Sequence, residues 1–540
     1  MKNKKTTLLA LALAATCAAA SASAADLILV NQDVGTGAGL DDPTAKAPEG
    51  GNPGTTLGEQ RRLVYQYAAR MWGSMLDSDV PVYIGARFIP QTCTPTSATL
   101  GSAGTTFVFR NFPGAPAADT WYHSALADSI VGVDLAPGNI DIQSQFNSRI
   151  NNDPTCLGGS TWYYGLDGNT PPGQINFLNV VMHEIAHGLG FSAFSNVSTG
   201  TLFNGFPDAY NRNAYNNTFA AAIPALSNAQ RQAAFRDNGN TVWTGANVSA
   251  AAPLFLDNLF TLNVTAPAGI AGSYEVGAAS FGPAATSANF EGEVVPGVPA
   301  DACTPLTNSA AVAGKVALVD RGVCAFTIKT LNAQAAGATA VLIANNAPGI
   351  VVPGGADPAV AIPALGISQA DGATIRGASP GVMITTGLNP NRRQGADATG
   401  RVRLYAPTTV APGSTFSHFD VVLTPNALME PSITSTLRAD VDVDMTTALL
   451  KDVGWQLNAR TAVGNCDTGI PAVSQTGFSI GGSVAGQAAL CEAKSTTRKQ
   501  YSQCLLDYAK QMAADGLLTN TQASRVVVCS VQNGYRLYPR

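Results

Sequence analysis

The sequence His-Glu-Ile-Ala-His, at residues 183–187, carries the residue types that catalytic zinc sites use. Histidines four residues apart lie on one face of a helix, so His183 and His187 can direct two imidazoles at one ion. Glu184 lies about 100° further around the helix axis, where it can take a proton from a water without binding the ion. Zinc lowers the pKa of a bound water towards about 7 and polarises a carbonyl group. The pattern therefore indicates a hydrolytic zinc site.

A catalytic zinc ion takes three protein ligands and keeps one position open, so a third ligand has to lie elsewhere. In the commonest form of the motif it follows six residues after the second histidine, but that position is Ala193. A glutamate on a following helix is another solution, yet no glutamate follows until the middle of the chain. Because the chain has four histidines, the residues alone leave His123 and His418 as candidates, and we expect a structural role for His123.

The motif also occurs by chance in unrelated proteins, and a histidine pair on a helix can be ordinary surface. Here two of only four histidines fall at this spacing, with the glutamate between them. Apolar residues would bury the rest of such a helix: Leu178, Val181, Met182, Ile185 and Leu189. The helix is expected to begin near Gln174, and Gly188 and Gly190 would let the chain turn away after it.

The N-terminus has the pattern of a secretory signal peptide over residues 1–25. A basic MKNKK segment precedes a short apolar run, and SASAAD offers small-residue cleavage sites; the alternative is an uncleaved membrane anchor. No later apolar run is long enough to span a membrane, so the mature protein is expected to be extracellular or periplasmic. Charged residues make up 12% of the chain and the net charge is −5, which gives no basic excess for binding nucleic acid.

Eight cysteines remain when Cys17, inside the apolar run, is set aside, and an even number in an exported protein implies disulfides. They fall into three groups: Cys93 and Cys156; Cys303 and Cys324; and Cys466, Cys491, Cys504 and Cys529. The last four allow three connectivities, between which the sequence does not choose. No CxxC spacing occurs, so a cysteine zinc site is not expected.

The elements that would position the motif form an α+β layer ahead of it. An amphipathic helix is predicted within residues 55–78, where Thr56 and Glu59 form a capping box and apolar residues repeat at helical spacing. Three strands are predicted from alternating or β-rich stretches: residues 80–88, 105–112 and 138–148. A chain of 540 residues is too long for one compact core, so further domains should follow.

From about Leu256 to Leu388 the chain is rich in Ala, Gly, Val and Pro and poor in charge. The segments KVALV, FTIKTLNAQAAGA and AVLIANN predict a strand, a helix and a strand, which together make a βαβ unit. With VALVDRGVCAF and IPALGIS in the same order, these segments resemble the protease-associated (PA) domain. The resemblance implies a non-catalytic insert or lid that commonly carries a disulfide, a role that Cys303 and Cys324 fit.

His418 lies in SHFDVVLTPNALMEP, eleven residues before Met429. This segment and HEIAHGLGFS resemble the leishmanolysin-type metzincins, in which an insertion separates the third histidine from the zinc helix. The resemblance implies that His418 is the third zinc ligand and that Met429 lies beneath the ligands as a hydrophobic floor. It extends to the closing helix TTALLKDVGW, and an inserted PA-like domain would explain why 231 residues separate His187 from His418.

The predicted fold is a metzincin-like α+β protease domain, interrupted by an α/β PA domain and followed by a small, partly helical region stapled by disulfides. The expected boundaries are 1–25 for the signal peptide, 26–255 and 389–460 for the protease domain, 256–388 for the PA-like insert and 461–540 for the four-cysteine region.

The predicted function is that of a secreted zinc metalloendopeptidase, which uses Zn2+ to hydrolyse peptide bonds in protein or peptide substrates. Glu184 would act as general base and then as proton donor to the leaving amine. One alternative is a PA-domain binding or adhesion protein with a degenerate protease fold, against which the retained histidines and Glu184 argue. The other alternative is a zinc hydrolase of non-peptide amides. The sequence does not predict the oligomeric state.

Overall fold

The structure is a computed structural model that describes residues 25–347, 349–440, 443–470, 483–514 and 516–538. The expected signal peptide lies outside these residues, apart from Ala25. The chain divides into two compact units. The first unit comprises Met1–Leu254, Leu404–Phe419 and Asn426–Arg540, and the second comprises Phe255–Arg403 and Asp420–Pro425.

A four-stranded sheet in the first unit has the strand order β1-β3-β7-β4. Its strands are β1 (Leu27–Asn31), β3 (Val82–Ile89), β7 (Ile142–Asn147) and β4 (Gly101–Thr105). The first three run parallel, whereas β4 pairs antiparallel with β7 and forms an edge of the sheet. Two of the three predicted strands are confirmed as β3 and β7. The third, residues 105–112, holds only the last residue of β4 and the two-residue strand β5 (Val108–Phe109).

Helix α1 (Leu57–Met75) confirms the predicted amphipathic helix. The hydroxyl of Thr56 accepts a hydrogen bond from the backbone N–H of Glu59 at 3.2 Å and so caps the first turn. The predicted capping box is formed only in part, because the Glu59 carboxylate accepts from the N–H of Thr55 at 2.8 Å.

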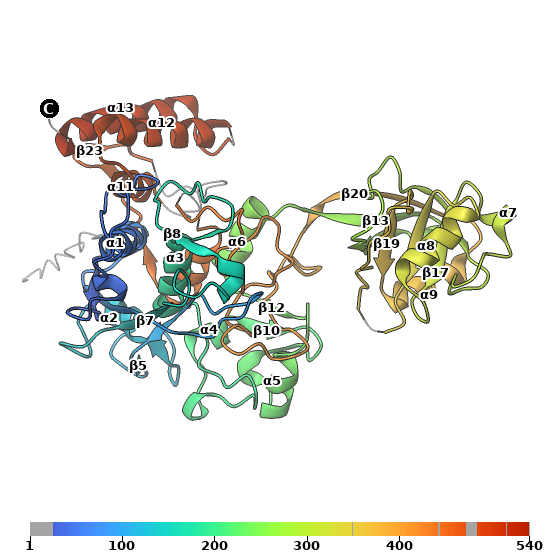
Figure 1. The fold of residues 1–540 in the computed structure, drawn as a ribbon, viewed down its shortest axis with the longest axis horizontal. Helices are drawn as coiled ribbons and strands as arrows, with labels where there is room; N and C mark the ends of the chain where they lie inside the picture. Colours follow the sequence, from blue (N-terminus) through green and yellow to red (C-terminus); the bar gives the residue numbers. More distant parts are fainter. Residues whose placement is uncertain (1–24, 348, 441–442, 471–482, 515, 539–540) are drawn as a thin grey trace, which may run out of the picture. The chain divides into compact units, whose positions relative to one another are not determined.

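Helix α3 (Phe177–Leu189) carries the His-Glu-x-x-His motif, and every one of its residues is buried (Figure 1). It begins three residues later than expected, because Gln174–Asn176 form the strand β9. The side chain of Asn176 then accepts from the N–H of Asn179 at 3.1 Å and caps the helix.

Two close approaches fix α3 against its neighbours. Trp72 of α1 donates its indole N–H to the carbonyl oxygen of Met182 at 3.1 Å. Gly188 lies directly on β7, where an added Cβ would come within 2.3 Å of Cγ2 of Ile142. Gly188 was expected to let the chain turn away after the helix. In the structure its main effect is to let α3 pack closely on the sheet.

An eight-stranded sheet forms the centre of the second unit, in the order β14-β13-β20-β16-β17-β18-β19-β15. Its strands are β13 (Asn258–Ala266), β14 (Gly272–Glu275), β15 (Gly277–Ala278), β16 (Gly292–Pro296), β17 (Val316–Asp320), β18 (Ala340–Ala344), β19 (Ala364–Ile367) and β20 (Val382–Arg393). The strands from β16 to β19 run parallel to one another. The predicted βαβ unit is confirmed as β17, α8 (Phe326–Ala335) and β18.

Alternate residues of β17 enter two different cores. Val316 and Leu318 pack in the core that contains Ile375 of α9 (Gln369–Ala378), whereas Ala317 and Val319 pack in the core that contains Ala333 of α8. Both faces of this sheet are therefore covered, as is usual for parallel strands.

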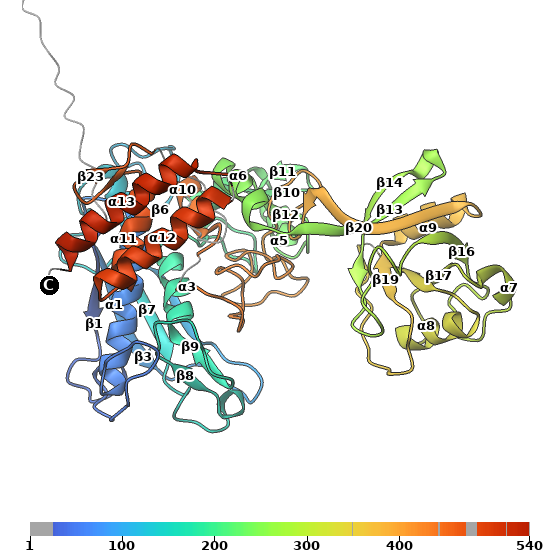
Figure 2. The same cartoon turned by 90° about the horizontal axis from the view of Figure 1, so that it is seen from above.

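The C-terminal part of the first unit is helical, with α10 (Thr446–Val453), α11 (Val484–Lys494), α12 (Arg498–Ala514) and α13 (Asn520–Leu537). Helices α12 and α13 lie side by side (Figure 1, Figure 2). Asn458 donates its backbone N–H to Met75 and its side-chain amide to Ser74, at 2.9 and 3.0 Å, and so joins this region to the end of α1. Helix α11 also contacts α1, and the segment expected at residues 461–540 groups with the first unit.

All eight remaining cysteines form disulfides, as expected. The pairs are Cys93–Cys156, Cys303–Cys324, Cys466–Cys529 and Cys491–Cys504. The structure thus selects one of the three connectivities that the last four cysteines allowed. Within the described residues, none of the helices has the length and apolar character needed to cross a membrane.

Candidate metal centre

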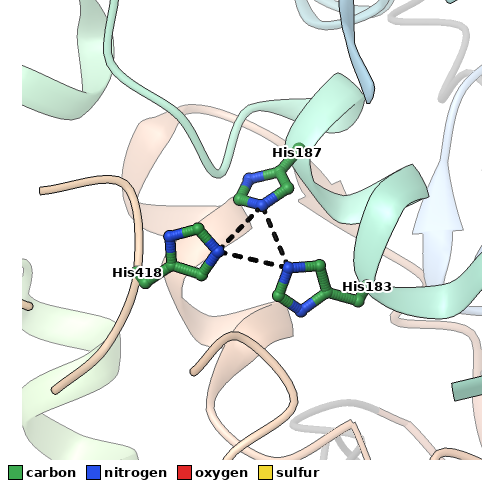
Figure 3. Close-up of side chains that lie close together, drawn as sticks. All are labelled: His183, His187 and His418. Atoms are coloured by element: carbon green, nitrogen blue, oxygen red, sulfur yellow. Dashed lines mark hydrogen bonds between the residues drawn. The ribbon is translucent and has the colours of Figure 1, made fainter. Parts of the chain in front are cut away.

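His183, His187 and His418 direct their Nε2 atoms towards one point (Figure 3). The Nε2–Nε2 distance is 3.1 Å between His183 and His187, and 3.2 Å from each of them to His418. All three side chains are buried. Two histidines come from α3. The third comes from Leu404–Phe419, a segment of the first unit that follows Phe255–Arg403 of the second unit in the chain.

The outer nitrogen of each ring faces a backbone carbonyl oxygen. The Nδ1 contacts are His183 to Leu428 at 2.7 Å, His187 to Phe191 at 2.8 Å and His418 to Ser414 at 2.7 Å. Because a carbonyl oxygen only accepts, each neutral ring carries its proton on Nδ1 and a lone pair on Nε2. The three Nε2 atoms therefore do not hydrogen bond to one another. Their convergence is the arrangement of three ligands around a cation.

Burial also keeps these rings in the form that binds metal. Burial lowers the pKa of His183 to about 4. It lowers the pKa of His187 to about 3, with a smaller contribution from the neighbouring His183. The pKa of His418 is held well below its usual range by burial and then by the two other imidazoles. All three rings are neutral at neutral pH, and neutral imidazole is the ligand form.

The spacing of the three nitrogens fits zinc. Zinc–nitrogen bonds of roughly 2.0–2.1 Å in tetrahedral geometry place two ligand nitrogens roughly 3.3 Å apart. The observed distances of 3.1 and 3.2 Å are close to this value. Calcium and magnesium prefer oxygen ligands, so an all-nitrogen set favours a transition metal or zinc. Three protein ligands with a fourth position free are the donor set of a catalytic zinc site.

Glu184 lies next to the histidines without joining their group. Its carboxylate accepts a hydrogen bond from the backbone N–H of Ala103, but Oε2 is buried and has no partner among the described residues. Burial raises the pKa of Glu184 to about 8, against the lowering effect of the Ala103 hydrogen bond. A buried oxygen without a partner is costly, and Glu184 lines a cleft from which a water or a substrate could supply one.

Two adjoining clefts lead to this centre. The first, of about 610 Å³, is lined by Glu184 and all three histidines. The second, of about 620 Å³, continues past His187. Both are bordered by Ala103 of β4 and by Gly413, so together they form one groove along the edge strand.

The edge strand β4 presents backbone groups to this groove, and one of them, the N–H of Ala103, bonds to Glu184. The carbonyl of Leu100 and the N–H of Thr106 bond to residues flanking or ending β7, at 2.9 and 2.7 Å. Since the direction of these groups alternates along an antiparallel strand, those of Gly101 and Ala103 point away from β7. The side chains here are small, which allows another backbone to approach closely.

His123 lies outside the three-histidine group. Its Nε2 is 2.8 Å from the hydroxyl of Ser192, and its ring contacts Phe194 with centroids 4.5 Å apart. Ala193, at the position where a third ligand commonly occurs, donates its N–H to the hydroxyl of Ser417 at 3.1 Å. The loop after α3 thereby holds the segment that carries His418.

Met429 is fully buried in a tight turn, which Glu430 closes by donating its N–H to Ala427 at 3.2 Å. The same turn supplies the Leu428 carbonyl that orients His183. Asp444 accepts from the N–H of Leu428 and thereby fixes the turn.

Sequence reasoning did not identify the supporting groups Leu428, Phe191, Ser414 and Asp444. Three of them act through backbone carbonyls, which leave no trace in residue type. Asp444 also accepts from the N–H and hydroxyl of Thr446 at 3.0 and 2.9 Å, at the start of α10. The pattern of Asp444 followed two residues later by Thr446 was the only feature of the sequence that could have indicated the role of Asp444.

A model of the PA domain family matches residues 290–375. Signal peptide peptidase-like 2 of Arabidopsis thaliana is 43% identical over 82 residues, which are 14% of this chain and 15% of that protein. Vacuolar-sorting receptor 2 of Arabidopsis thaliana is 36% identical over 115 residues, which are 20% of this chain and 18% of that protein. The chain thus spans less than a fifth of either relative. It contains a PA domain inside the second unit, and none of the three histidines lies in residues 290–375.

Among solved structures, BSAP, a zinc aminopeptidase from Bacillus subtilis, is 26% identical over 25% of this chain and 31% of its own, with a TM-score of 0.20. The subtilisin-like protease Apa1 from Pseudoalteromonas sp. AS-11 is 14% identical over 45% of this chain and 52% of its own, with a TM-score of 0.21. These scores are too low to bear on the fold of the first unit.

Proposed function

We propose that the chain is a secreted, metzincin-type zinc endopeptidase with His183, His187 and His418 as zinc ligands and Glu184 as general base. The observation that carries the proposal is the convergence of three buried, neutral imidazoles beside a buried carboxylate. The turn that contains Met429 and orients His183 supports the metzincin resemblance. Four disulfides suit an oxidising, extracytoplasmic compartment.

Zinc in this site would polarise the substrate carbonyl and make a water more acidic. The positive charge of zinc bound beside it would favour the ionised form of Glu184. Its Oε2 would then take a proton from the attacking water and later pass it to the leaving amine. Its hydrogen bond from Ala103 holds the carboxylate beside the edge strand and leaves Oε2 without a partner among the described residues. The three carbonyl-bound imidazoles keep their orientation throughout, because each Nδ1 is fixed.

The edge strand β4 would bind the substrate backbone. An extended peptide can add itself to the free edge of a sheet through main-chain hydrogen bonds. Outward-facing groups on Gly101 and Ala103 border the groove that holds Glu184 and the histidines. Such pairing places a peptide bond next to the catalytic residues without depending on particular side chains.

The charge of the groove favours cleavage within a chain over removal of a terminal residue. Apart from Glu184 and the three histidines, the residues that line the two clefts carry no ionisable side chain. An exopeptidase has to bind the charged amine or carboxylate of a chain end, which requires an opposite charge when the group is desolvated. We therefore assign internal peptide bonds as the substrate.

The test is hydrolysis of casein and of peptides with blocked ends by the purified protein, before and after treatment with a chelator. Cleavage of the blocked peptides at internal bonds is expected, with loss on chelation and recovery on addition of zinc. Cleavage only of peptides with a free terminus would contradict endopeptidase activity. Bound zinc without any amide hydrolysis would favour the alternative of a binding protein.

A further inference from the structure

The second cleft extends beyond His187, and its lining combines serine and threonine residues with four bulky apolar side chains that the proposed chemistry does not use. Phe194, Val197 and Phe203 line it from the loop after α3, and Val108 of β5 lines it as well. These four residues are called the apolar end below. No charged side chain lines the cleft in the described part of the chain. Arg110 stacks on Trp121 and Phe206 but pairs with Asp119 at 3.0 Å, and it does not line the cleft.

Phe203 is held in a fixed position although 41% of it is exposed. Trp121 donates its indole N–H to the carbonyl oxygen of Phe203 at 3.0 Å, and the two rings meet edge to face with centroids 5.5 Å apart. The ring of Phe194 makes a second edge contact at 6.2 Å. An aromatic ring that is exposed but already immobilised loses little conformational entropy when a ligand covers it.

We infer that the apolar end binds a bulky aromatic or branched aliphatic side chain of the peptide substrate. This inference rests on the proposed function, because the cleft leads directly from the proposed zinc site at His187. A charged side chain there would lose its hydration without gaining a counter-charge. A glycine or alanine would leave Phe203 exposed to water and gain nothing from it.

The test uses the full-length, zinc-loaded protein and internally quenched peptides with blocked ends, in which one position at a time is varied. At one position, wild-type protein should prefer Phe, Tyr, Leu or Ile over Gly, Asp or Lys by about tenfold or more in kcat/KM. Phe203→Ala should reduce this preference about tenfold, and Phe203→Leu should restore most of it.

Two further variants separate the subsite from general effects on the fold. Phe107 is 38% exposed and does not line the cleft, so Phe107→Ala should keep the apolar preference. Val197→Lys would place an ammonium group in the apolar end, and the preference at the same position should shift towards Asp or Glu.

The possible failures are distinguishable. If wild-type protein shows no chelator-sensitive cleavage of any peptide, the proposed function is wrong. If wild-type protein cleaves peptides without an apolar preference, or if Phe203→Ala leaves that preference unchanged, the inference is overturned while the proposed function stands.

Discussion

Glu184 is the residue whose replacement best separates chemistry from metal binding. Glu184→Gln keeps the size of the side chain and all three histidines, so zinc content should stay near one per chain. Loss of the general base should lower kcat by about 10²–10⁴-fold. Metal analysis and peptide hydrolysis on the same sample test this expectation. Glu293→Gln, in the second unit, is the matched control and should retain activity; comparable activity in both variants would contradict the role of Glu184.

His418 and His123 form a matched pair, because both are buried and either replacement by alanine leaves a cavity. Only His418 directs a nitrogen at the other two histidines. His418→Ala should weaken zinc binding by more than the 10–100-fold that loss of an outer-shell partner typically costs. His123→Ala should retain zinc and lower the melting temperature. Titration of both variants with zinc measures the difference, and equal zinc affinities would exclude His418 as a ligand.

At the level of elements, α3 depends on its close approach to β7. Gly188→Ala should destabilise the protein by about 1–3 kcal/mol, because the new Cβ would overlap Ile142. Gly377→Ala, within α9, is the control: nothing lies within 4 Å of its added Cβ, and alanine there should be neutral or stabilising by up to about 1 kcal/mol. Denaturant unfolding measures both. A Gly188→Ala protein as stable as wild type would show that α3 can move away from the sheet.

The same elements show what sequence patterns could predict. Helix α1 and strand β3 follow from apolar periodicity, because each buries one face against the core. Strand β4 was not predicted, since Gly-Ser-Ala-Gly-Thr has little intrinsic strand preference and is fixed by pairing with β7. The sequence therefore did not predict the strand that borders the candidate groove, although the spacing of His183 and His187 predicted their role.

At the level of the whole molecule, sequence similarity located the PA domain but not the limits of the second unit. The expected insert ended at residue 388, whereas the unit runs to Arg403 and regains Asp420–Pro425. Backbone bonds cause this: Asp257 donates to Thr424 at 2.7 Å. Because Asp257 and Thr424 are 167 residues apart, no local sequence pattern predicts their hydrogen bond. The turn at Asp420–Pro425 begins two residues after His418, so the second unit holds the chain next to the proposed third ligand.

Because of this connection, removal of the insert should affect the segment that carries His418. Deleting Phe255–Arg403 and joining Leu254 to Leu404 through a flexible linker retains all three histidines. It removes the residues that hold Asp420–Pro425, including Gln394, whose side-chain amide donates to the carbonyl of Val422 at 3.0 Å.

The deletion variant should therefore still bind one zinc per chain at saturation, but with lower affinity and faster release. In the full chain, Gly395→Ala is a milder form of the same change, because its Cβ would lie 2.6 Å from Cδ1 of Leu423. It should weaken zinc binding in the same direction and by a smaller factor. Zinc dissociation into excess chelator, followed with a metal indicator, measures all three proteins. Identical release rates would show that the His418 segment keeps its geometry without the second unit.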